Sequence, residues 1–439
     1  MTLLRTRPRR PAGVRVEGAH AAAPTIDVRE VNPVGWRRRT DPAVGVLLPA
    51  DPVRQRAAVA AVHERLGGNR PGGHRTAFPV FLAPHGVAAH GVGPGVVRRL
   101  PSAPAARARV LHSLRGVLDL GLLHGSGHAR ARWLIEVAAR GAPLVAEDLD
   151  EAAAWLDPGL NASIAGVGLA GLQDEEVREA VSVDQRRAAI RAHGSHRVAG
   201  GQGGARAAGS ALSVSVLLAS RWPGRLEAAV ARADRQSHPR VEIVVALHGE
   251  EVPPGLADRL RGTTERHLVL LRVPSSSTLG DVLNAATHVA SGALVTKMDD
   301  DDLYDHAHVE DLVDALHYSG ATVVGKGSEY VHLEEIDTTI RRFPRGAESR
   351  SRNVAGGTLL LSRDDLAEVG GWQRVARAVD QCLLDDVERA GGRVHRTAGR
   401  GFLLCRRAQG HTWDPGLDYF LRQAVRQWRG LARDAAGVA

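Results

Sequence analysis

A run of four consecutive aspartates, Asp299 to Asp302, follows the apolar stretch 293–295 and constrains this chain more than any other feature. An apolar stretch that ends abruptly in acids is typical of a buried strand whose C-terminal end opens into a cleft. In open α/β sheets, ligands bind at the carboxyl ends of the strands. Because four adjacent carboxylates repel one another, we expect a cation among them. Oxygen ligands favour magnesium or manganese, which would bridge to a phosphorylated substrate.

Two other interpretations of the aspartate run stay open at this level. The run could be a solvated acidic loop, since most acidic runs are solvated, or it could hold calcium. The sequence on both sides of the run favours the ligand-binding interpretation, as described below.

Length and composition exclude several classes of protein. With 439 residues the chain is too long for one ordinary core, so we expect two or three domains. Aromatic residues make up only 4%, too few for a stacking platform, so we expect no nucleic-acid partner. Cys382 and Cys405 fit neither a disulfide framework nor a zinc site. Because there is no apolar stretch of membrane-spanning length and no secretory signal in residues 1–18, we expect a cytoplasmic protein.

The net charge of +8 is unevenly distributed along the chain. Residues 1–211 contain 28 Lys and Arg against 18 Asp and Glu, whereas residues 212–439 contain 29 against 31. The basic N-terminal half could therefore make peripheral contact with the anionic inner face of a membrane. A disordered Arg-rich tail over residues 1–18 explains part of the same excess. Lysine occurs only at Lys297 and Lys326, and we expect at least one ammonium near a diphosphate or the carboxylates, unless both are ordinary surface lysines.

Residues 19–197 alternate between helix-like and strand-like patterns, which predicts an α/β, Rossmann-like lobe. The polar stretch 175–193 predicts a helix, and residues 132–145 predict a helix, a glycine stop and a strand. The remaining patterns predict a strand at 44–48, a helix at 53–66, an apolar run at 78–82 and a second helix at 105–123.

Within this lobe, Glu136 is followed by Gly141-Ala142-Pro143. This arrangement resembles the C-terminal lobe of GT-B-fold glycosyltransferases, in which a glutamate-bearing helix leads into a Gly-x-Pro-Val turn near the sugar nucleotide. Roughly 200 residues is small for the two lobes that such an enzyme needs. We therefore favour a degenerate accessory lobe, with a second active site as the alternative.

Residues 198–211 contain five glycines among alanines and serines, which predicts a linker between domains. Beyond it we expect a domain over 212–425 and a C-terminal tail over 426–439. Apolar stretches predict strands at 212–218, 241–247, 267–273 and 293–297, with helices at 223–235 and 279–290. This order predicts a mostly parallel sheet with a nucleotide site at its strand ends.

Several short motifs follow one another over residues 212–413. They are Ala219-Ser220-Arg221 after the first strand, Gln236-Ser237-His238-Pro239, Leu279-Gly280, Asn284-Ala285-Ala286, Asp299-x-Asp301, Gly356-Gly357-Thr358, Gly370-Gly371-Trp372 and Asp380. In this order and spacing they resemble family-2 glycosyltransferases, which have the GT-A fold. The resemblance covers about half of the chain.

The resemblance implies a metal-dependent transfer of sugar from a nucleotide-sugar donor. Asp301, with Asp299 or Asp302, would hold Mn²⁺ or Mg²⁺. Asp380 would be the base, and its position in the first turn of a predicted helix also suits a simple N-cap. The acceptor side would contain Gly356, Gly357 and Trp372. The donor would be bound by Ala219, Ser220, Arg221, His248, Leu279, Asn284, Lys297, Asp299 and Asp300.

Three positions depart from the family pattern. His248 follows the second strand where the family has an acid that contacts the nucleotide base, and Val379 replaces the glutamate of the Glu-Asp pair. Gly410-His411-Thr412-Trp413 replaces the Gln-x-x-Arg-Trp of processive members. His411 resembles a C-terminal histidine that is a further metal ligand in some GT-A enzymes. A phosphate contact or an ordinary surface histidine are the alternatives.

We therefore expect a glycosyltransferase that uses a glycan, lipid-linked or protein acceptor, by family in cell-envelope or capsule synthesis. A metal-dependent nucleotidyltransferase is the alternative among enzymes, because it shares a nucleotide fold and paired acids. A non-catalytic protein that binds polyanions or glycans is the alternative from another class. The sequence names neither the donor sugar nor the acceptor.

Overall fold

The structure is a computed structural model. It describes residues 23–29, 41–46, 97–99, 111, 114–119, 121, 126–146, 148–168, 171–195, 212–249, 251–342, 347–408 and 415–438. Several sequence predictions lie outside these residues: the tail over 1–18, the helix over 53–66, the apolar run over 78–82, the linker over 198–211 and the proposed ligand His411.

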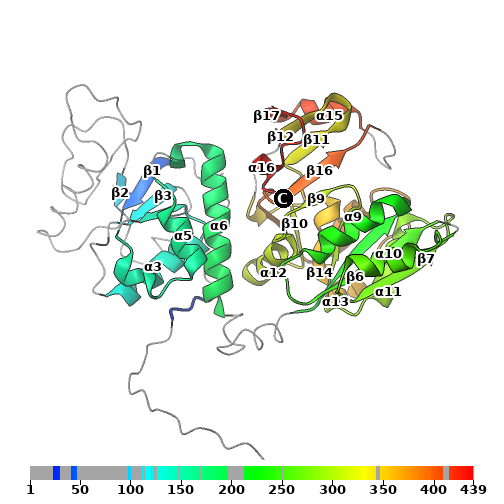
Figure 1. Cartoon of the computed structure of the whole chain (residues 1–439), viewed down its shortest axis with the longest axis horizontal. Helices are drawn as coiled ribbons and strands as arrows, with labels where there is room; N and C mark the ends of the chain where they lie inside the picture. The colour runs from blue at the N-terminus through cyan, green and yellow to red at the C-terminus, as the bar shows by residue number, and fades with distance from the viewer. Residues whose placement is uncertain are drawn as a thin grey trace, which may run out of the picture.

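The N-terminal lobe contains a parallel four-stranded sheet in the order β2-β1-β3-β4, seen at the left of Figure 1. The predicted helix, glycine stop and strand over 132–145 are confirmed, because α3 ends before Gly141 (φ 69°) and β4 follows. The helix predicted over 105–123 is wrong in its second half, where β3 pairs with β1 and β4. The strands are β1 (Asp41–Val46), β2 (Val97–Arg99), β3 (Leu114–Asp119) and β4 (Leu144–Ala146).

Helices cover this sheet, and the longest is the predicted polar helix α6. Asp174 caps α6 by accepting from the backbone N–H groups of Glu176 and Val177. The Gln185 side chain bonds both the N–H and the C=O of Leu144 at 2.8 Å, which attaches α6 to β4. The helical elements are α3 (Gly127–Ala139), α4 (Asp150–Ala153), α5 (Pro158–Ala165), η2 (Gly171–Gln173) and α6 (Glu175–His193).

The C-terminal domain is built on an eight-stranded mixed sheet in the order β13-β15-β10-β14-β8-β5-β6-β7. Its central strands are nearly continuous apolar runs, as expected where both faces of a sheet are covered. The predicted strand–helix order over 212–297 is confirmed, with one additional helix, α10. The strands are β5 (Val214–Ser220), β6 (Val241–His248), β7 (Leu268–Val273), β8 (Leu294–Lys297), β10 (Val323–Lys326), β13 (Ser349–Arg350), β14 (Leu360–Ser362) and β15 (Val394–Thr397).

The helices of this domain pack against the sheet around two large apolar clusters. Pro223 stands at the first position of α9, where its fixed φ suits the start of a helix. Thr278 and Asp281 form a capping box at the start of α11. The helical elements are α9 (Pro223–Asp234), α10 (Leu256–Thr263), α11 (Leu279–Val289), α12 (His308–Ser319), η4 (Gly356–Thr358), α13 (Arg363–Glu368) and α14 (Val379–Arg389).

A second, five-stranded sheet has the order β17-β12-β11-β16-β9 and lies above the large sheet in Figure 1. β9 directly follows the aspartate run and pairs with β16. The structure differs from the predicted tail over 426–439, because β17 pairs with β12 and α16 follows it. The elements are β9 (Leu303–Tyr304), β11 (Tyr330–Leu333), η3 (Glu334–Ile336), β12 (Thr338–Arg342), β16 (Phe402–Arg406), α15 (Leu417–Leu421), β17 (Ala424–Arg429) and α16 (Arg433–Ala436).

None of the helices in the described ranges combines the length and the apolar character that crossing a bilayer requires.

Candidate active site

The carboxyl ends of three neighbouring parallel strands form one edge of the large sheet. β5 lies between β6 and β8, with Ser220 opposite Leu247 and Leu217 opposite Lys297. The backbone N–H of Met298 also donates to Leu217 O at 3.1 Å, so the chain leaves β8 beside β5. The aspartate run therefore starts at a sheet edge where α/β proteins bind ligands.

The four aspartates have different surroundings. Asp300 accepts a hydrogen bond from the Ser220 hydroxyl, and Asp302 accepts one from the Cys405 N–H at 2.9 Å. The Asp302 side chain is buried, whereas those of Asp299 and Asp301 are 33% and 22% exposed. Asp299 and Asp301 are thus the two members of the run that a ligand reaches most easily.

Burial and, after it, mutual repulsion raise the pKa of two members of the run. For Asp301, burial is the largest cause, and the negative charges of Asp299 and Asp300 add to it. For Asp302, burial and then the charges of Asp299 and Asp301 raise the pKa well above its ordinary value. Both shifts show that the ionised carboxylates are disfavoured by burial and by one another, and a bound cation would offset this cost.

Lys297, the last residue of β8, lies near two carboxylates predicted for the site: Asp299 as a metal and donor ligand, and Asp380 as the base. Its ammonium is 2.8 Å from Asp299 Oδ1. Although burial alone would lower it, the nearby charges of Asp299 and Asp380 raise the pKa of Lys297. Lys297 therefore stays charged and connects the aspartate run to the start of α14.

Gly356 and Gly357 of η4 pack directly against these carboxylates. A Cβ at position 356 would lie 2.2 Å from Asp380 Oδ2, and one at position 357 would lie 2.7 Å from Asp299 Oδ2. Neither contact leaves room for a side chain. The two glycines predicted on the acceptor side are thus needed for Asp299 and Asp380 to approach the same turn.

Tyr304 of β9 fastens the aspartate run to this turn. Its hydroxyl accepts from the Asp299 N–H at 2.8 Å and donates to Gly357 O at 2.9 Å. Its ring is buried against His308 and Phe402, with ring centroids 4.8 Å and 5.3 Å away. Nothing in the sequence pattern indicated this role for Tyr304, although the residue lies only two positions after the run.

Asp380 is the second residue of α14, whose N-cap position is occupied by Ala378 in the left-handed region (φ 58°). Asp380 is therefore not the N-cap itself. Its carboxylate lies in the first helical turn, where the helix dipole stabilises negative charge. Asp380 is half-buried, and its carboxylate lies directly beside Gly356.

Arg221 and His248 meet at the ends of β5 and β6. Arg221 Nε donates to His248 Nδ1 at 3.0 Å, which places the proton of the neutral ring on Nε2. Burial, and then the charge of Arg221, lower the pKa of His248. Ala219 lies one residue before the end of β5, so the structure brings three of the predicted donor-site residues to this edge.

Asn284 and Trp372 contact each other. Asn284 Nδ2 donates to Trp372 O at 2.7 Å, and the Trp372 N–H donates to Asn284 Oδ1 at 2.9 Å. The Trp372 indole is buried and donates to Thr287 Oγ1 at 3.1 Å. Leu279 is partly buried at the start of the same helix, α11. These contacts hold the turn after α13 against α11, a structural role that the sequence alone did not indicate.

Comparison with known protein families adds an independent observation. The family model described as Glycosyl transferase family 2 matches residues 220–358. This part of the chain is a family-2 glycosyltransferase domain. The match begins at Ser220, includes the whole aspartate run and ends at Thr358, immediately after the two glycines. Asp380, the family's expected base, lies beyond the matched residues.

Solved structures similar to this chain include the crystal structure of S. aureus TarS, with 15% identity and a TM-score of 0.35 over 44% of this chain and 37% of that chain. Another is S. aureus TarS 1-349 in complex with UDP-GlcNAc, with 15% identity and a TM-score of 0.37 over 46% of this chain and 60% of that chain. The matches thus span less than two thirds of either TarS chain. A search of curated proteins found no match.

Two arginines of α9 contact the aspartate run, and the sequence-based prediction of the site did not include them. Arg225 Nη1 lies 3.6 Å from Asp300 Oδ1 and 3.5 Å from Asp301 Oδ2. Arg232 Nη2 donates to Asp300 O at 2.6 Å. Their spacing of about two helical turns on α9 could have indicated a shared face, but nothing in the sequence showed that this face meets the acids.

No group of three or more His, Cys, Asp and Glu side chains is arranged to hold a metal ion within the described ranges. Asp299 and Asp301, the two most exposed carboxylates of the aspartate run, are the remaining candidates. His411, the proposed third ligand, lies outside the described residues. The GT-B-like resemblance of the N-terminal lobe stays unconfirmed, and its Glu136 carboxylate pairs with Arg140 at 3.2 Å.

Proposed function

We propose that this chain is a metal-dependent glycosyltransferase that moves a sugar from a nucleotide-sugar donor to a hydroxyl acceptor. The observation that carries the proposal is the meeting of Asp299, Lys297 and Asp380 around Gly356 and Gly357. A metal-side carboxylate, a cation and a base candidate are then close together beside one glycine turn.

The residues present fit a divalent ion held jointly with a diphosphate. Magnesium and manganese are commonly bound by one or two carboxylates, substrate phosphates and water, and they do not require three protein ligands. Asp299 and Asp301 supply two partly exposed carboxylates, and a cation would offset the burial and the mutual repulsion that raise the pKa of Asp301. When bound there, the ion would neutralise charge on the leaving diphosphate. Asp302 is the weaker candidate, because Cys405 occupies one of its oxygens.

Asp380 is the base candidate. In the transfer, the bond between the sugar and the donor phosphate breaks and a bond to the acceptor oxygen forms. The proton of the acceptor hydroxyl would pass to the Asp380 carboxylate. The charge of Asp380 helps to raise the pKa of Lys297, so a positively charged ammonium stands near the base candidate. Arg221 and His248 at the neighbouring strand ends would contact the nucleotide part of the donor.

The remaining expectations belong to the same proposal. The acceptor is a glycan, a lipid-linked molecule or a protein, in cell-envelope or capsule synthesis. The protein acts in the cytoplasm, with the basic N-terminal half contacting the inner face of the membrane. No nucleic acid takes part. The N-terminal lobe is accessory to the family-2 domain.

The experiment is to incubate the purified chain with Mn²⁺ and a panel of nucleotide sugars, with and without candidate acceptors, and to measure released nucleoside diphosphate. We expect release with one donor class and its loss on chelation. A nucleotidyltransferase would release pyrophosphate when supplied with a nucleoside triphosphate and a sugar phosphate. Absence of nucleoside diphosphate with every donor and acceptor would contradict the proposal.

A further inference from the structure

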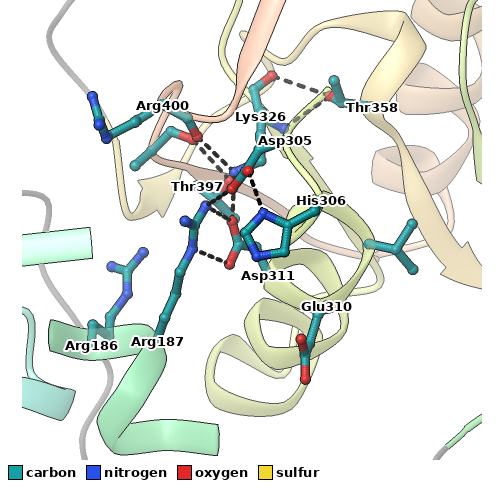
Figure 2. A network of polar contacts seen from close by, with 12 residues as sticks. Arg186, Arg187, Asp305, His306, Glu310, Asp311, Lys326, Thr358, Thr397 and Arg400 are labelled. Atoms are coloured by element: carbon teal, nitrogen blue, oxygen red, sulfur yellow. Dashed lines mark hydrogen bonds and ion pairs between the residues drawn. The ribbon is translucent and has the colours of Figure 1, made fainter. Parts of the chain in front are cut away.

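Helix α6 belongs to the N-terminal lobe by its contacts with β4, yet its other side is bonded to the family-2 domain. Arg187 extends from α6 toward Asp305 and Asp311 (Figure 2). Its Nε and Nη2 atoms bond the two oxygens of Asp311 at 2.8 and 2.7 Å, and Nη2 also lies 2.9 Å from Asp305 Oδ2. The three side chains are 8–14% exposed, so solvent screens these ion pairs weakly.

The first connection from Arg187 leads to the aspartate run. Asp305 lies three residues after Asp302, at the end of β9. Its N–H donates to Gly401 O at 3.0 Å, and its C=O accepts from Gln236 Nε2 at 3.0 Å. Tyr304, the residue directly before Asp305, accepts a hydrogen bond from the Asp299 N–H through its hydroxyl. A displacement of Asp305 would therefore move β9 and, through it, the metal-side carboxylates.

The second connection leads to the glycine turn. Asp311 accepts from Lys326 Nζ at 3.0 Å, and Nζ also donates to Arg400 O at 2.9 Å. The backbone of Lys326 holds the other side of η4, because its N–H donates to Thr358 Oγ1 at 2.9 Å and its C=O accepts from Ala355 N at 2.8 Å. Lys326 is thus attached to the turn that contacts Asp299 and Asp380.

The packing at the junction leaves little freedom. Gly401 adopts φ 85°, and a Cβ there would lie 3.2 Å from both Arg187 Nη2 and the Asp305 Cβ. His308 is fully buried beside Tyr304, and neither of its ring nitrogens has a hydrogen-bond partner among the described residues. A residue with such close neighbours transmits displacement rather than absorbing it.

We propose that Arg187 is a positioning residue of the transferase: from the N-terminal lobe, it fixes both the segment after the aspartate run and the turn that faces Asp380. This inference rests on the proposed function, since it assigns the accessory lobe a part in building the donor site. The lobe then completes the site without contacting the donor.

A buried ion pair could also be purely structural, since breaking one lowers stability whatever its position. The matched control is Arg191, one turn further along α6, which pairs with Glu310 at 3.0 Å and lies 3.8 Å from Asp311. Within the described part of the chain, Arg191 forms no ion pair or hydrogen bond with Asp305 or Lys326. Arg187→Met and Arg191→Met should both lower the unfolding temperature.

The test measures binding of Mn²⁺ together with UDP, GDP, ADP or CDP by calorimetry, with the full-length chain. For the nucleotide that wild type binds, Arg187→Met should weaken affinity on the order of 10–100-fold, the scale expected when a supporting residue shifts a site by about 1 Å. Arg191→Met should change it by less than about threefold, and Arg187→Lys, which keeps the charge, should recover part of the loss.

Equal affinities in Arg187→Met and Arg191→Met would overturn the inference. If Arg187→Met does not fold, Asp305→Asn is used in its place, because the amide keeps the shape of the side chain and removes the ion pair with Arg187. Unchanged nucleotide affinity in Asp305→Asn would likewise overturn the inference. Wild-type protein that binds none of the four nucleotides would instead contradict the proposed function, so the two failures are distinguishable.

Discussion

Lys297 Nζ lies 2.8 Å from Asp299 Oδ1, so one of the two lysines in the chain neutralises the first carboxylate of the aspartate run. The other, Lys326, is buried against Asp311. The expectation that at least one lysine places an ammonium near the carboxylates of the run therefore agrees with the position of Lys297, whereas Lys326 pairs with Asp311 outside the run. Their roles in donor binding stay predictions.

Lys297→Met should lower the transfer rate by about 10²-fold, because a preorganised charge next to developing negative charge typically contributes this much. Lys297→Arg should restore the rate only in part, because a planar guanidinium does not replace a compact ammonium where the lysine side chain is only 12% exposed beside Asp299. Steady-state kinetics with the identified donor would measure both. A wild-type rate and donor affinity in Lys297→Arg would mean that the position has no specific requirement for lysine.

Asp301→Ala should abolish turnover and weaken Mn²⁺ binding while the fold persists, because the variant removes one of the two exposed carboxylates. Asp302→Asn is the comparison, since its amide oxygen can still accept from Cys405 N–H. We expect it to keep most of the Mn²⁺ affinity. Calorimetry with Mn²⁺ and circular dichroism measure binding and folding. Unchanged Mn²⁺ affinity in Asp301→Ala would remove its role as a ligand.

Asp380→Asn should lower the transfer rate by ~10²–10⁴-fold, the usual contribution of a positioned base, because the amide conserves the shape and cannot accept the proton. Binding of the donor should persist, since Asp380 faces the acceptor-side turn at Gly356. Rates and donor affinity are measured separately. Wild-type transfer by this variant would show that the base is another residue.

Local patterns in the sequence predicted much of the fold and part of the site. The strands β5, β6 and β8 are apolar runs that end in turns or charges, so periodicity located them and placed Ser220, His248 and Asp299 at one sheet edge. The family motifs added Asp380, which lies eighty residues from the run but beside Gly356. Each of these inferences depends on a strand end or a short motif.

The features that the sequence did not indicate depend on contacts between distant segments. Tyr304 and Arg225 are ordinary residues in their own elements, and only the packing of β9 and α9 brings them to the carboxylates. The helix expected over 105–123 is an incorrect prediction with the same cause. Residues 114–119 form a strand because they pair with β1 and β4. Tertiary pairing overrides local propensity in such cases.

His411 stays a prediction from the sequence. If it is a metal ligand, Mn²⁺ binding in the presence of the donor nucleotide should weaken as the pH falls through about 6.5, because a ligand imidazole must be neutral. His411→Ala should bind Mn²⁺ more weakly and lose that part of the pH dependence. Titrations of both proteins between pH 5.5 and 8 would measure it. Equal affinity of the variant and wild type at pH 8 would exclude His411 as a ligand.

Glu348 provides a prediction about acid stability at the junction of the two lobes. Its buried carboxylate lies 2.7 Å from Arg186 Nη1 and accepts from the Tyr318 hydroxyl at 2.7 Å. Burial by itself favours the neutral acid, but Arg186 and the hydrogen bond from His395 outweigh it and lower the pKa of Glu348 from 4.5 to about 2. The folded protein therefore binds the Glu348 proton less tightly than the unfolded chain does.

A folded-state pKa below the unfolded value stabilises the protein above the unfolded pKa, and this stabilisation is lost as the pH falls toward the folded value. For Glu348 the window runs from pH 4.5 down to about 2, and the contribution is roughly 3 kcal/mol. Glu348→Gln removes the titrating group, so the difference in unfolding free energy between wild type and variant should be largest above pH 4.5 and shrink through that window.

Urea unfolding of both proteins at a series of pH values measures this difference. Asp418→Asn is the matched control, because Asp418 is 85% exposed and lies 3.8 Å from Arg422, a pairing that solvent screens. We expect its difference from wild type to stay near zero throughout. A constant difference between Glu348→Gln and wild type from pH 6 to pH 3 would show that Arg186 and His395 do not hold Glu348 in its ionised form.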